Sequence, residues 1–501
     1  MSLRYGSVVL VALVLLPHMA SAASIVKNLP GYKGDLPFKL ETGYIGVGEE
    51  EEVQIFHLFV ESQRNPFIDP LLIWFVGGPG CSALSAFFFE NGPLVMNENY
   101  NGNLPKLELN PYSWTHTLNM IYIDMPVGTG FSYSETQEGY YSSDILWVKH
   151  TYEFLQKWFI DHPKFSSNPF YIGGGSYSGM ITGPLVQQVY EGYKARRKPL
   201  MNIKGYVLAS PAVDGFREQN MKVLYAYQRS LIPEALYKSM KENCNGDYIN
   251  IDPENTKCVS DYSVYVELVR YINEQQIMEP LCITTPGVNR EILQEVQDPP
   301  TFWCRVELIG LSCLTFLFVR LGHEADLKLS TVFQSYYHIL VDTWANDENV
   351  RKALHVREGT KEEFLRCNRT MAYTTTRLNT VEFYRNLTNA NLEALVYCAD
   401  LDMNVPHLGT QYWINSFNTS IRDKWRAWFV DGQVAGYTEV HKTKEDHYLT
   451  YVIVKARISL NKLIYVFCHF NAMQGAGHVA QTFKPKEVYH LINRWFSFSL
   501  I

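Results

Sequence analysis

The stretch that decides the fold reads FYIGGGSYSG over residues 170–179. A short apolar run gives way there to small residues on both sides of Ser176. A sharp strand-to-helix turn that projects a serine outward crowds its neighbours, so the positions two before and two after it must be small. Gly174 and Ser178 meet that requirement. The stretch predicts a buried strand and a tight turn carrying Ser176; a glycine-rich loop whose serine caps a helix is the alternative.

Three other apolar runs end in small or polar residues. They are LLIWFV at 71–76 before GGPG at 77–80, MIYID at 120–124 before PVGTG at 126–130, and LEALVY at 392–397 before Asp400 and Asp402. Continuous apolar strands, buried on both faces, are typical of a parallel sheet covered by helices. Residues 144–159 have the spacing of such a helix. We therefore expect an α/β fold whose polar groups gather at the carboxyl ends of the strands.

The chain contains the residue types needed for nucleophilic catalysis by serine. A serine hydroxyl is a poor nucleophile unless an imidazole takes its proton and a carboxylate orients that imidazole. Ser176, Asp402 and His478 follow one another in the order that α/β hydrolases use. Glycines at 77 and 78 let backbone N–H groups approach a developing oxyanion, so Gly78 and Tyr177 are the candidate donors. For the GGPG stretch alone, an ordinary tight turn is the alternative.

Composition excludes several classes of protein. The chain has 501 residues, 47% of them hydrophobic, and its 44 Lys+Arg against 51 Asp+Glu give a formal charge of −7. It is too apolar for a disordered protein, and it has no basic stripe for nucleic acid. None of its nine cysteines lies in a CxxC pair, and no histidine cluster accompanies them, so we expect no metal and no cofactor.

The N-terminus predicts a secretory signal peptide over residues 1–22. Arg4 precedes an apolar run at 8–16, and ASA at 20–22 supplies the small residues of a cleavage site. A buried N-terminal helix is the alternative. No later segment reaches membrane length, so we expect no membrane anchor and a secreted or vacuolar protein. In that compartment Asn368, Asn386 and Asn418 are candidate glycosylation sites.

Five ordered stretches resemble the serine carboxypeptidase-like family. They are WFVGGPGCS at 74–82, ENGP at 90–93, DMPVGTGFSY at 124–133, the Ser176 turn, and DLDMNVP at 400–406. Shorter stretches at 23–27, 344–347 and 435–438 are similar to the plant branch of that family, which includes sinapoylglucose acyltransferases. The resemblance covers nearly the whole chain after the predicted signal peptide.

The resemblance implies an α/β-hydrolase fold over residues 23–501, with a mainly parallel central sheet and a helical cap inserted at about 213–345. The charge-rich, cysteine-rich composition of that middle region agrees. The resemblance also implies roles for individual residues: Ser176 as nucleophile, His478 as base, Asp402 as acid, Gly78 and Tyr177 as oxyanion donors, and Gly77, Glu90 and Gly175 as substrate contacts. Asp400 matches a structural position of the family.

The resemblance implies three disulfides, which are Cys81–Cys367, Cys244–Cys258 and Cys282–Cys304. Cys313, Cys398 and Cys468 remain unpaired. Two segments, 305–334 and 456–474, are apolar and match nothing in the family. We expect them to be retained intron translations or gene-model errors, because the family runs from its last strand almost directly into Gly-x-Gly-His.

Two substitutions distinguish the chain from the family. Gly175 stands where the family usually has Asp or Glu, which the related acyltransferases generally keep, and Val76 stands where it usually has Asn, or in some acyltransferases Thr or Ser. In the peptidases those groups, with the glutamate that matches Glu90, bind the substrate carboxylate, and losing such a partner costs roughly 1–3 kcal/mol. Glu90, without a proton-sharing neighbour, would ionise and repel that carboxylate.

Three functions follow from these observations. In the first two, an acyl-enzyme at Ser176 passes its acyl group either to an acceptor hydroxyl or to water, as in a carboxypeptidase. The motif similarity to the plant branch and the weakened carboxylate site slightly favour the hydroxyl acceptor. The third is a catalytically inactive relative that keeps the pocket for binding. The expected partner is a small-molecule acyl ester or a peptide rather than nucleic acid, and the oligomeric state stays open.

Overall fold

A computed structural model of the chain describes residues 24–97, 103–279, 334–455, 475–499 and 501. The predicted signal peptide at 1–22, the segment 456–474 and nearly all of 305–334 lie outside these ranges. So do Cys282, Cys304, Cys313 and Cys468.

Twelve strands of the described chain form one sheet. In spatial order they are β1 (Ser24–Val26), β2 (Leu40–Val47), β3 (Val53–Val60), β7 (Asn119–Ile123), β4 (Leu71–Phe75), β10 (Phe170–Gly175), β11 (Ile203–Ala209), β13 (Glu393–Ala399), β16 (Tyr448–Val454), β15 (Gln433–Lys442) and β14 (Ser420–Val430), with β8 (Tyr133–Ser134) paired to β3. The strands from β7 to β16 run parallel, and both flanks are antiparallel. The predicted α/β-hydrolase architecture with a parallel central sheet is confirmed.

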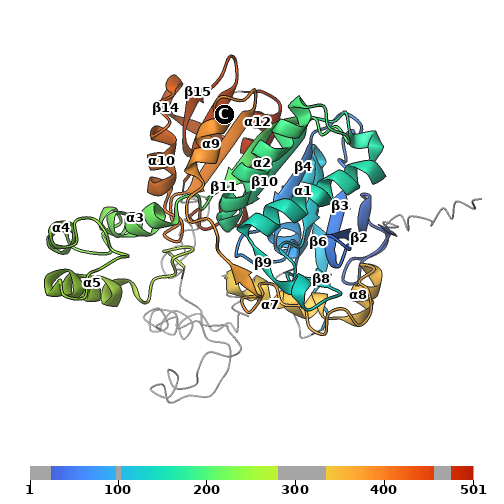
Figure 1. Cartoon of the computed structure of the whole chain (residues 1–501), viewed down its shortest axis with the longest axis horizontal. Helices are drawn as coiled ribbons and strands as arrows, with labels where there is room; N and C mark the ends of the chain where they lie inside the picture. The colour runs from blue at the N-terminus through green and yellow to red at the C-terminus, as the bar shows by residue number, and fades with distance from the viewer. Residues whose placement is uncertain (1–23, 98–102, 280–333, 456–474, 500) are drawn as a thin grey trace, which may run out of the picture.

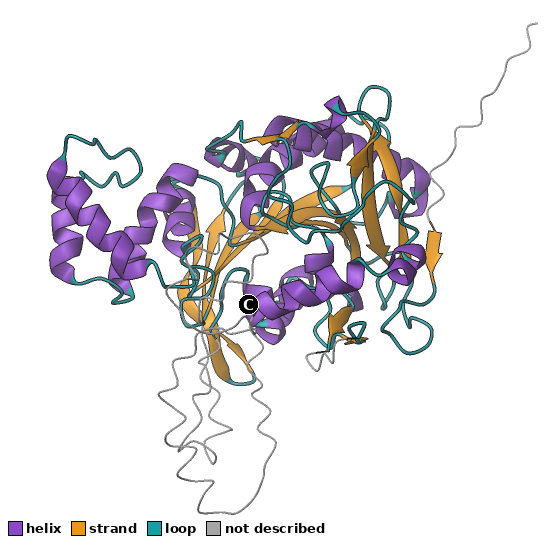
Figure 2. Cartoon of the chain, turned by 90° about the horizontal axis from the view of Figure 1, so that it is seen from below, coloured by secondary structure: helices purple, strands orange, loops and turns teal. Residues whose placement is uncertain are grey.

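Helices cover both faces of the sheet (Figure 2). On one face lie α1 (Asp144–Asp161), α2 (Gly179–Lys194), α9 (Val381–Leu387) and α10 (His407–Asn415); on the other lie α7 (Gln334–Ala345), α8 (Glu348–Ala353), α11 (Ala480–Phe483) and α12 (Pro485–Phe496). Strand β4 explains this arrangement, because its side chains alternate between two cores. Leu72 and Trp74 pack in the α12 core, whereas Ile73 and Phe75 pack in the α1–α2 core. A strand buried on both faces requires apolar residues at every position.

Strand β10 is longer than the sequence indicated. The apolar run stops at Ile172, yet the strand continues through three glycines to Gly175. Neighbouring strands approach closely there, since a Cβ at Gly173 would lie 2.7 Å from the Val207 carbonyl oxygen. The predicted strands at 71–76, 120–124 and 392–397 correspond to β4, β7 and β13, and the predicted helix at 144–159 is α1.

Three helices, which we call the cap helices, extend from one end of the sheet (Figure 1). They are α3 (Gly215–Gln228), α4 (Glu234–Asn243) and α5 (Thr256–Val269), and they enclose a small core of their own. Helix α7, which the sequence prediction counted with the cap, instead packs Leu340, Val341 and Trp344 into a core of the sheet.

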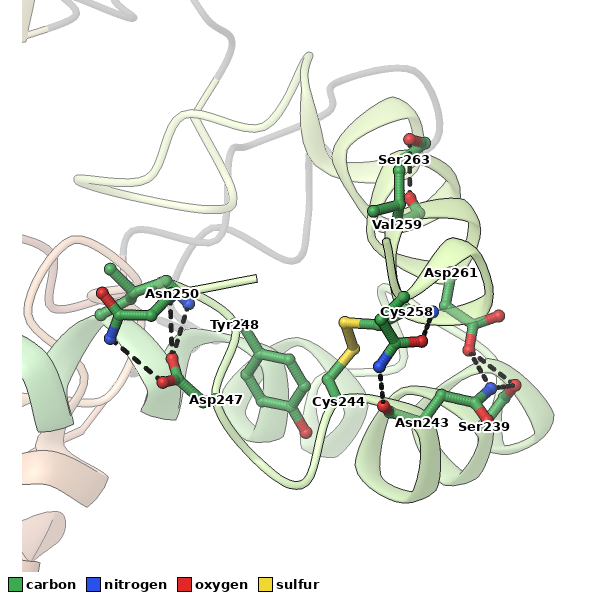
Figure 3. Close-up of a disulfide and its surroundings, with 12 residues drawn as sticks. Ser239, Asn243, Cys244, Asp247, Tyr248, Asn250, Cys258, Val259, Asp261 and Ser263 are labelled. Carbon is green, nitrogen blue, oxygen red and sulfur yellow. Dashed lines mark hydrogen bonds between the residues drawn. A yellow bond between two sulfur atoms is a disulfide. The ribbon is translucent and has the colours of Figure 1, made fainter. Parts of the chain in front are cut away.

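A disulfide between Cys244 and Cys258 joins α4 to α5 (Figure 3). The Asp261 carboxylate accepts hydrogen bonds from Ser239 Oγ at 2.7 Å and from Asn243 Nδ2 at 2.8 Å beside it. A second disulfide joins Cys81 to Cys367, so both expected pairs whose cysteines are described are present.

Smaller elements complete the described chain. They are the strand pairs β5 (Leu94–Met96) with β6 (Leu107–Leu109) and β9 (Ser142–Ser143) with β12 (Tyr373–Thr374), and the short helices η1 (Ala86–Glu90), η2 (Trp114–His116), η3 (Glu138–Tyr140), η4 (Pro163–Phe165) and η5 (Ser176–Ser178). Among the described helices, none has the length and apolar character needed to cross a bilayer.

The contact between β11 and β13 yields a test of the sheet. A Cβ at Gly205 would lie 2.1 Å from the Glu393 carbonyl oxygen. Gly205→Ala should therefore push two central strands apart and lower the free energy of unfolding by about 1–3 kcal/mol, measured by chemical denaturation. Gly215→Ala is the matched control, because its Cβ would meet nothing closer than 3.6 Å. Equal stability of the two variants would contradict this packing.

Candidate active site

The turn after β10 holds Ser176 in a left-handed backbone conformation, with φ of 59°. That geometry is strained for a residue with a side chain and is typical of a nucleophile elbow. A Cβ at Gly174 would lie 2.4 Å from Ser178 Oγ, so the requirement for small flanking residues holds. The residue at the N-cap of α2 is Ser178, and its hydroxyl donates to the Gly175 carbonyl oxygen at 2.9 Å rather than capping the helix.

His478 and Asp402 meet at the same edge of the sheet. Asp402 follows β13 and is fully buried, and its Oδ2 lies 2.7 Å from His478 Nδ1. The Val405 N–H donates to the other carboxylate oxygen at 2.9 Å. Asp402 is thus held on both oxygens, and it fixes the orientation of the imidazole.

Asp400 takes no part in this contact. Its backbone N–H donates to the Val454 carbonyl oxygen at 3.1 Å, and its carbonyl oxygen accepts from Tyr225 Oη at 2.8 Å. These bonds tie the turn to β16 and to cap helix α3, in keeping with the structural role expected for Asp400.

The GGPG turn after β4 lies directly against the serine turn. A Cβ at Gly77 would stand 2.6 Å from Ser176 Cβ and 2.9 Å from the Tyr177 backbone nitrogen. Gly78 has φ of 120°, which favours glycine. The two candidate oxyanion donors, Gly78 and Tyr177, therefore belong to turns in contact.

These turns open onto one cavity of about 530 Å³. The sequence-predicted residues that line it are Gly77, Gly78, Glu90, Gly175, Ser176 and His478. Asp402 lies behind His478, and Val76 contributes an apolar patch to the wall. The wall also includes both cysteines of the Cys81–Cys367 disulfide and Asn368.

The Tyr177 side chain has a structural partner that the sequence did not reveal. Its hydroxyl donates to Asp144 Oδ1 at 2.7 Å, and Tyr373 Oη donates to the same oxygen at 2.6 Å. The N–H groups of Thr376 and Arg377 donate to Asp144 Oδ2. Asp144, buried at the start of α1, thereby anchors the residue after Ser176, and no motif marks it in the sequence.

Glu90 is buried in the cavity wall. Its Oε2 accepts from Trp74 Nε1 at 2.8 Å and from Gln481 Nε2 at 2.9 Å. Burial raises the pKa of Glu90, whereas the hydrogen bonds from Gln481 and Trp74 act in the opposite direction. The ionisation expected from the sequence is thus displaced to higher pH.

Arg366 brings a positive charge to the same wall, which sequence reasoning missed. Burial lowers the pKa of Arg366 to about 10, and Asp342 acts in the opposite direction. The guanidinium therefore stays charged at neutral pH. It lines the cavity with Glu90, so the wall offers a cation to an anionic part of a substrate.

The three glycosylation sequons differ in their surroundings. Asn386 and Asn418 are exposed. Asn368 is half-buried and its Nδ2 donates to the Gly128 carbonyl oxygen at 3.0 Å. A sugar has open space at the first two positions and would border the cavity at the third.

Glu218, on cap helix α3, has a raised pKa, and its carboxyl group interacts electrostatically with Asp402. One of its carboxylate oxygens accepts from Val213 N at 2.6 Å and from Asp214 N at 3.0 Å. Burial raises the pKa of Glu218 to about 7, and the charges of Asp214 and Asp402 add to the effect.

This shift predicts a pH-dependent stability. From the ordinary pKa of 4.5 up to about 7, the folded protein retains a proton at Glu218 that the unfolded chain releases, so the free energy of unfolding falls as pH rises. Glu218→Gln should remove this pH dependence. Between pH 4.5 and pH 8, the free energy of unfolding of the variant should rise relative to that of the parent by up to about 3 kcal/mol, measured by chemical denaturation. The exposed Glu358→Gln serves as control. A constant difference between parent and E218Q across this range would contradict the assignment.

Known proteins resemble this chain over nearly its whole length. Residues 30–498 match the serine carboxypeptidase family. The chain is 40% identical to serine carboxypeptidase-like 7 of Arabidopsis thaliana over 486 residues, which cover 97% of this chain and 96% of the relative. It is 41% identical to serine carboxypeptidase-like 10 of the same plant over 489 residues, which cover 97% of each chain. The solved structure of Kex1(delta)p, a prohormone-processing carboxypeptidase from Saccharomyces cerevisiae, has the same fold, with a TM-score of 0.64 and 16% identity over 92% of this chain and 91% of that one. The chain belongs to the serine carboxypeptidase family.

Proposed function

We propose that the chain is an enzyme in which Ser176, His478 and Asp402 act together through an acyl-enzyme intermediate. The observation that carries this is the 2.7 Å hydrogen bond between His478 Nδ1 and Asp402 Oδ2, with His478 and Ser176 lining one cavity. Asp402 holds the tautomer in which His478 Nε2 is free to accept the serine proton. Ser176 then attacks a carbonyl carbon, and the imidazolium returns the proton to the leaving group.

The N–H groups of Gly78 and Tyr177 are proposed to stabilise the oxyanion of the tetrahedral intermediate. The contact between their two turns, and the absence of a side chain at Gly77, support this role. Two preorganised donors in a buried site typically supply several kcal/mol of transition-state stabilisation.

Acyl transfer to a hydroxyl acceptor is slightly favoured over peptide hydrolysis. The preference rests on the similarity to the plant branch and on a weakened carboxylate site, because Val76 and Gly175 line the cavity where the peptidases of the family bind the substrate carboxylate with polar side chains. Gly175 counts less than Val76, since the related acyltransferases generally keep an acidic residue at its position. A side chain at 175 would also crowd Val479, because a Cβ there lies 3.1 Å from Val479 Cγ1. The charge of Arg366 attracts a carboxylate in either reaction, so it does not separate them.

A glucose ester is the proposed acyl donor, on the similarity to the plant branch of the family. The carboxypeptidase remains the second candidate, supported by Glu90 in its expected place in the cavity wall.

We further propose passage through the secretory pathway, to the outside of the cell or the vacuole. The predicted signal peptide and the disulfides support this route, since disulfides persist in oxidising compartments.

The first test asks whether Ser176 is activated. A fluorophosphonate probe should label the parent protein at Ser176, found by peptide mass spectrometry, and label neither Ser176→Ala nor His478→Ala, because an unassisted serine hydroxyl is unreactive. An unlabelled but folded parent would support the inactive binding relative instead.

The second test separates the two reactions. Val76→Asn supplies a donor to a substrate carboxylate, so it should raise kcat/KM for a peptide about ten-fold relative to kcat/KM for a glucose ester. Val76→Ala, which opens the same space without a donor, is the matched control. If Val76→Asn and Val76→Ala change the ratio of the two kcat/KM values equally, a donor at position 76 does not decide between peptide hydrolysis and acyl transfer.

A further inference from the structure

A short segment of the chain passes between the two turns that carry His478 and Asp402. It is residues 273–277, which follow cap helix α5, and we call it the cap return. Its backbone bonds to both turns: the Gln275 carbonyl oxygen accepts from His478 N at 2.6 Å, and the Glu274 carbonyl oxygen accepts from Met403 N and Asn404 N, each at 2.8 Å.

The two turns are also bonded to one another at this place. Leu401 N donates to the Ala476 carbonyl oxygen at 2.9 Å, and Ile277 N of the cap return donates to the Leu401 carbonyl oxygen at 3.3 Å. A Cβ at Gly477 would lie 2.7 Å from the Gln275 carbonyl oxygen, so the backbones touch. Three segments far apart in sequence thus form one hydrogen-bonded unit around the His478–Asp402 contact.

Gln276 is the side chain that closes this unit. It is only 1% exposed, and its Nε2 donates to the Gly475 carbonyl oxygen at 2.8 Å. Its Oε1 accepts from the Met278 N–H at 3.1 Å, so the amide is held at both ends. A buried amide with partners on both atoms has one orientation, and it fixes the carbonyl that it contacts.

The place of Gly475 gives this bond its importance. Residues 475–477 read GAG, and glycine imposes little conformational preference of its own. The orientation of the imidazole therefore depends on contacts made by residues 475–478 themselves.

We propose that Gln276 is a positioning residue that holds residues 475–478 on the cap return and so keeps the His478 imidazole aligned between Asp402 and Ser176. The proposal rests on the proposed function, because alignment matters only if His478 moves the serine proton. Gln276 itself touches neither substrate nor the reacting atoms, and it acts through the backbone of Gly475.

The test compares Gln276→Leu and Gln276→Glu with a substitution of another buried glutamine. Leu removes both polar atoms, whereas Glu keeps the shape and the acceptor and loses the donor to Gly475. Gln54→Leu is the control, because Gln54 is also buried and its Nε2 donates to a backbone carbonyl, that of Glu51 at 2.7 Å, on the β2–β3 hairpin. If Gln276→Leu does not fold, Gln276→Glu decides the outcome.

Two readouts keep this proposal apart from the proposed function. Hydrogen-exchange mass spectrometry of the peptides spanning 475–483 and 401–404 should show faster exchange in both Gln276 variants and no change in Gln54→Leu. Fluorophosphonate inactivation should show a maximal rate constant lowered about ten- to one-hundred-fold with an unchanged half-saturating concentration, because a displacement of about 1 Å at a catalytic group has effects of that size.

Each result is decisive. Unchanged exchange at 475–483 in the Gln276 variants overturns the proposal, and so does faster exchange with an inactivation rate within two-fold of the parent. An equal fall in rate for Gln54→Leu would show a general loss of stability and would also overturn it. A parent that does not react contradicts the proposed function alone, and the exchange data then decide whether Gln276 holds the turn.

Discussion

The hydrogen bond between His478 and Asp402 is the interaction on which the site depends. Asp402 lies in the turn after β13, and His478 lies in a stretch that bonds to this turn through Leu401 N and the Ala476 carbonyl oxygen. A carboxylate 2.7 Å from an imidazole selects one tautomer, and in the proposed mechanism that tautomer accepts the Ser176 proton. The surrounding packing of strands, glycines and the cap return fixes this one distance.

Parallel strands account for most of that convergence. Strands β4, β10, β13 and β16 all end at one edge, and β10, β11 and β13 are direct neighbours. Glycines allow the closest backbone contacts at this edge, because a Cβ at Gly77 or Gly174 would overlap the serine turn. The same close approach, which leaves no room for a side chain at Gly77, brings the turn that carries Gly78 into contact with the turn that carries Ser176 and Tyr177.

The parts of the site that depend on neighbouring residues in the chain could be predicted from the sequence. The crowding around Ser176 and the runs of buried strand residues follow from the chain alone, and so did the α/β class with its parallel sheet, whereas the α/β-hydrolase fold was implied by the family resemblance. The supports of the site were not accessible in this way. Asp144 and Gln276 act through partners that are distant in sequence, and a buried polar residue without a motif resembles any other. The sequence prediction ended strand β10 too early for a related reason, since its glycines are strand residues because they pair with β4 and β11.

Trapping the acyl-enzyme tests the central claim most directly. Rapid acid quenching of the protein during the first turnover on an ester donor, followed by peptide mass spectrometry, should show the acyl group on the peptide that contains Ser176 and on no other. Turnover of the donor without an adduct at this serine, or with the acyl group on another residue, would contradict the account.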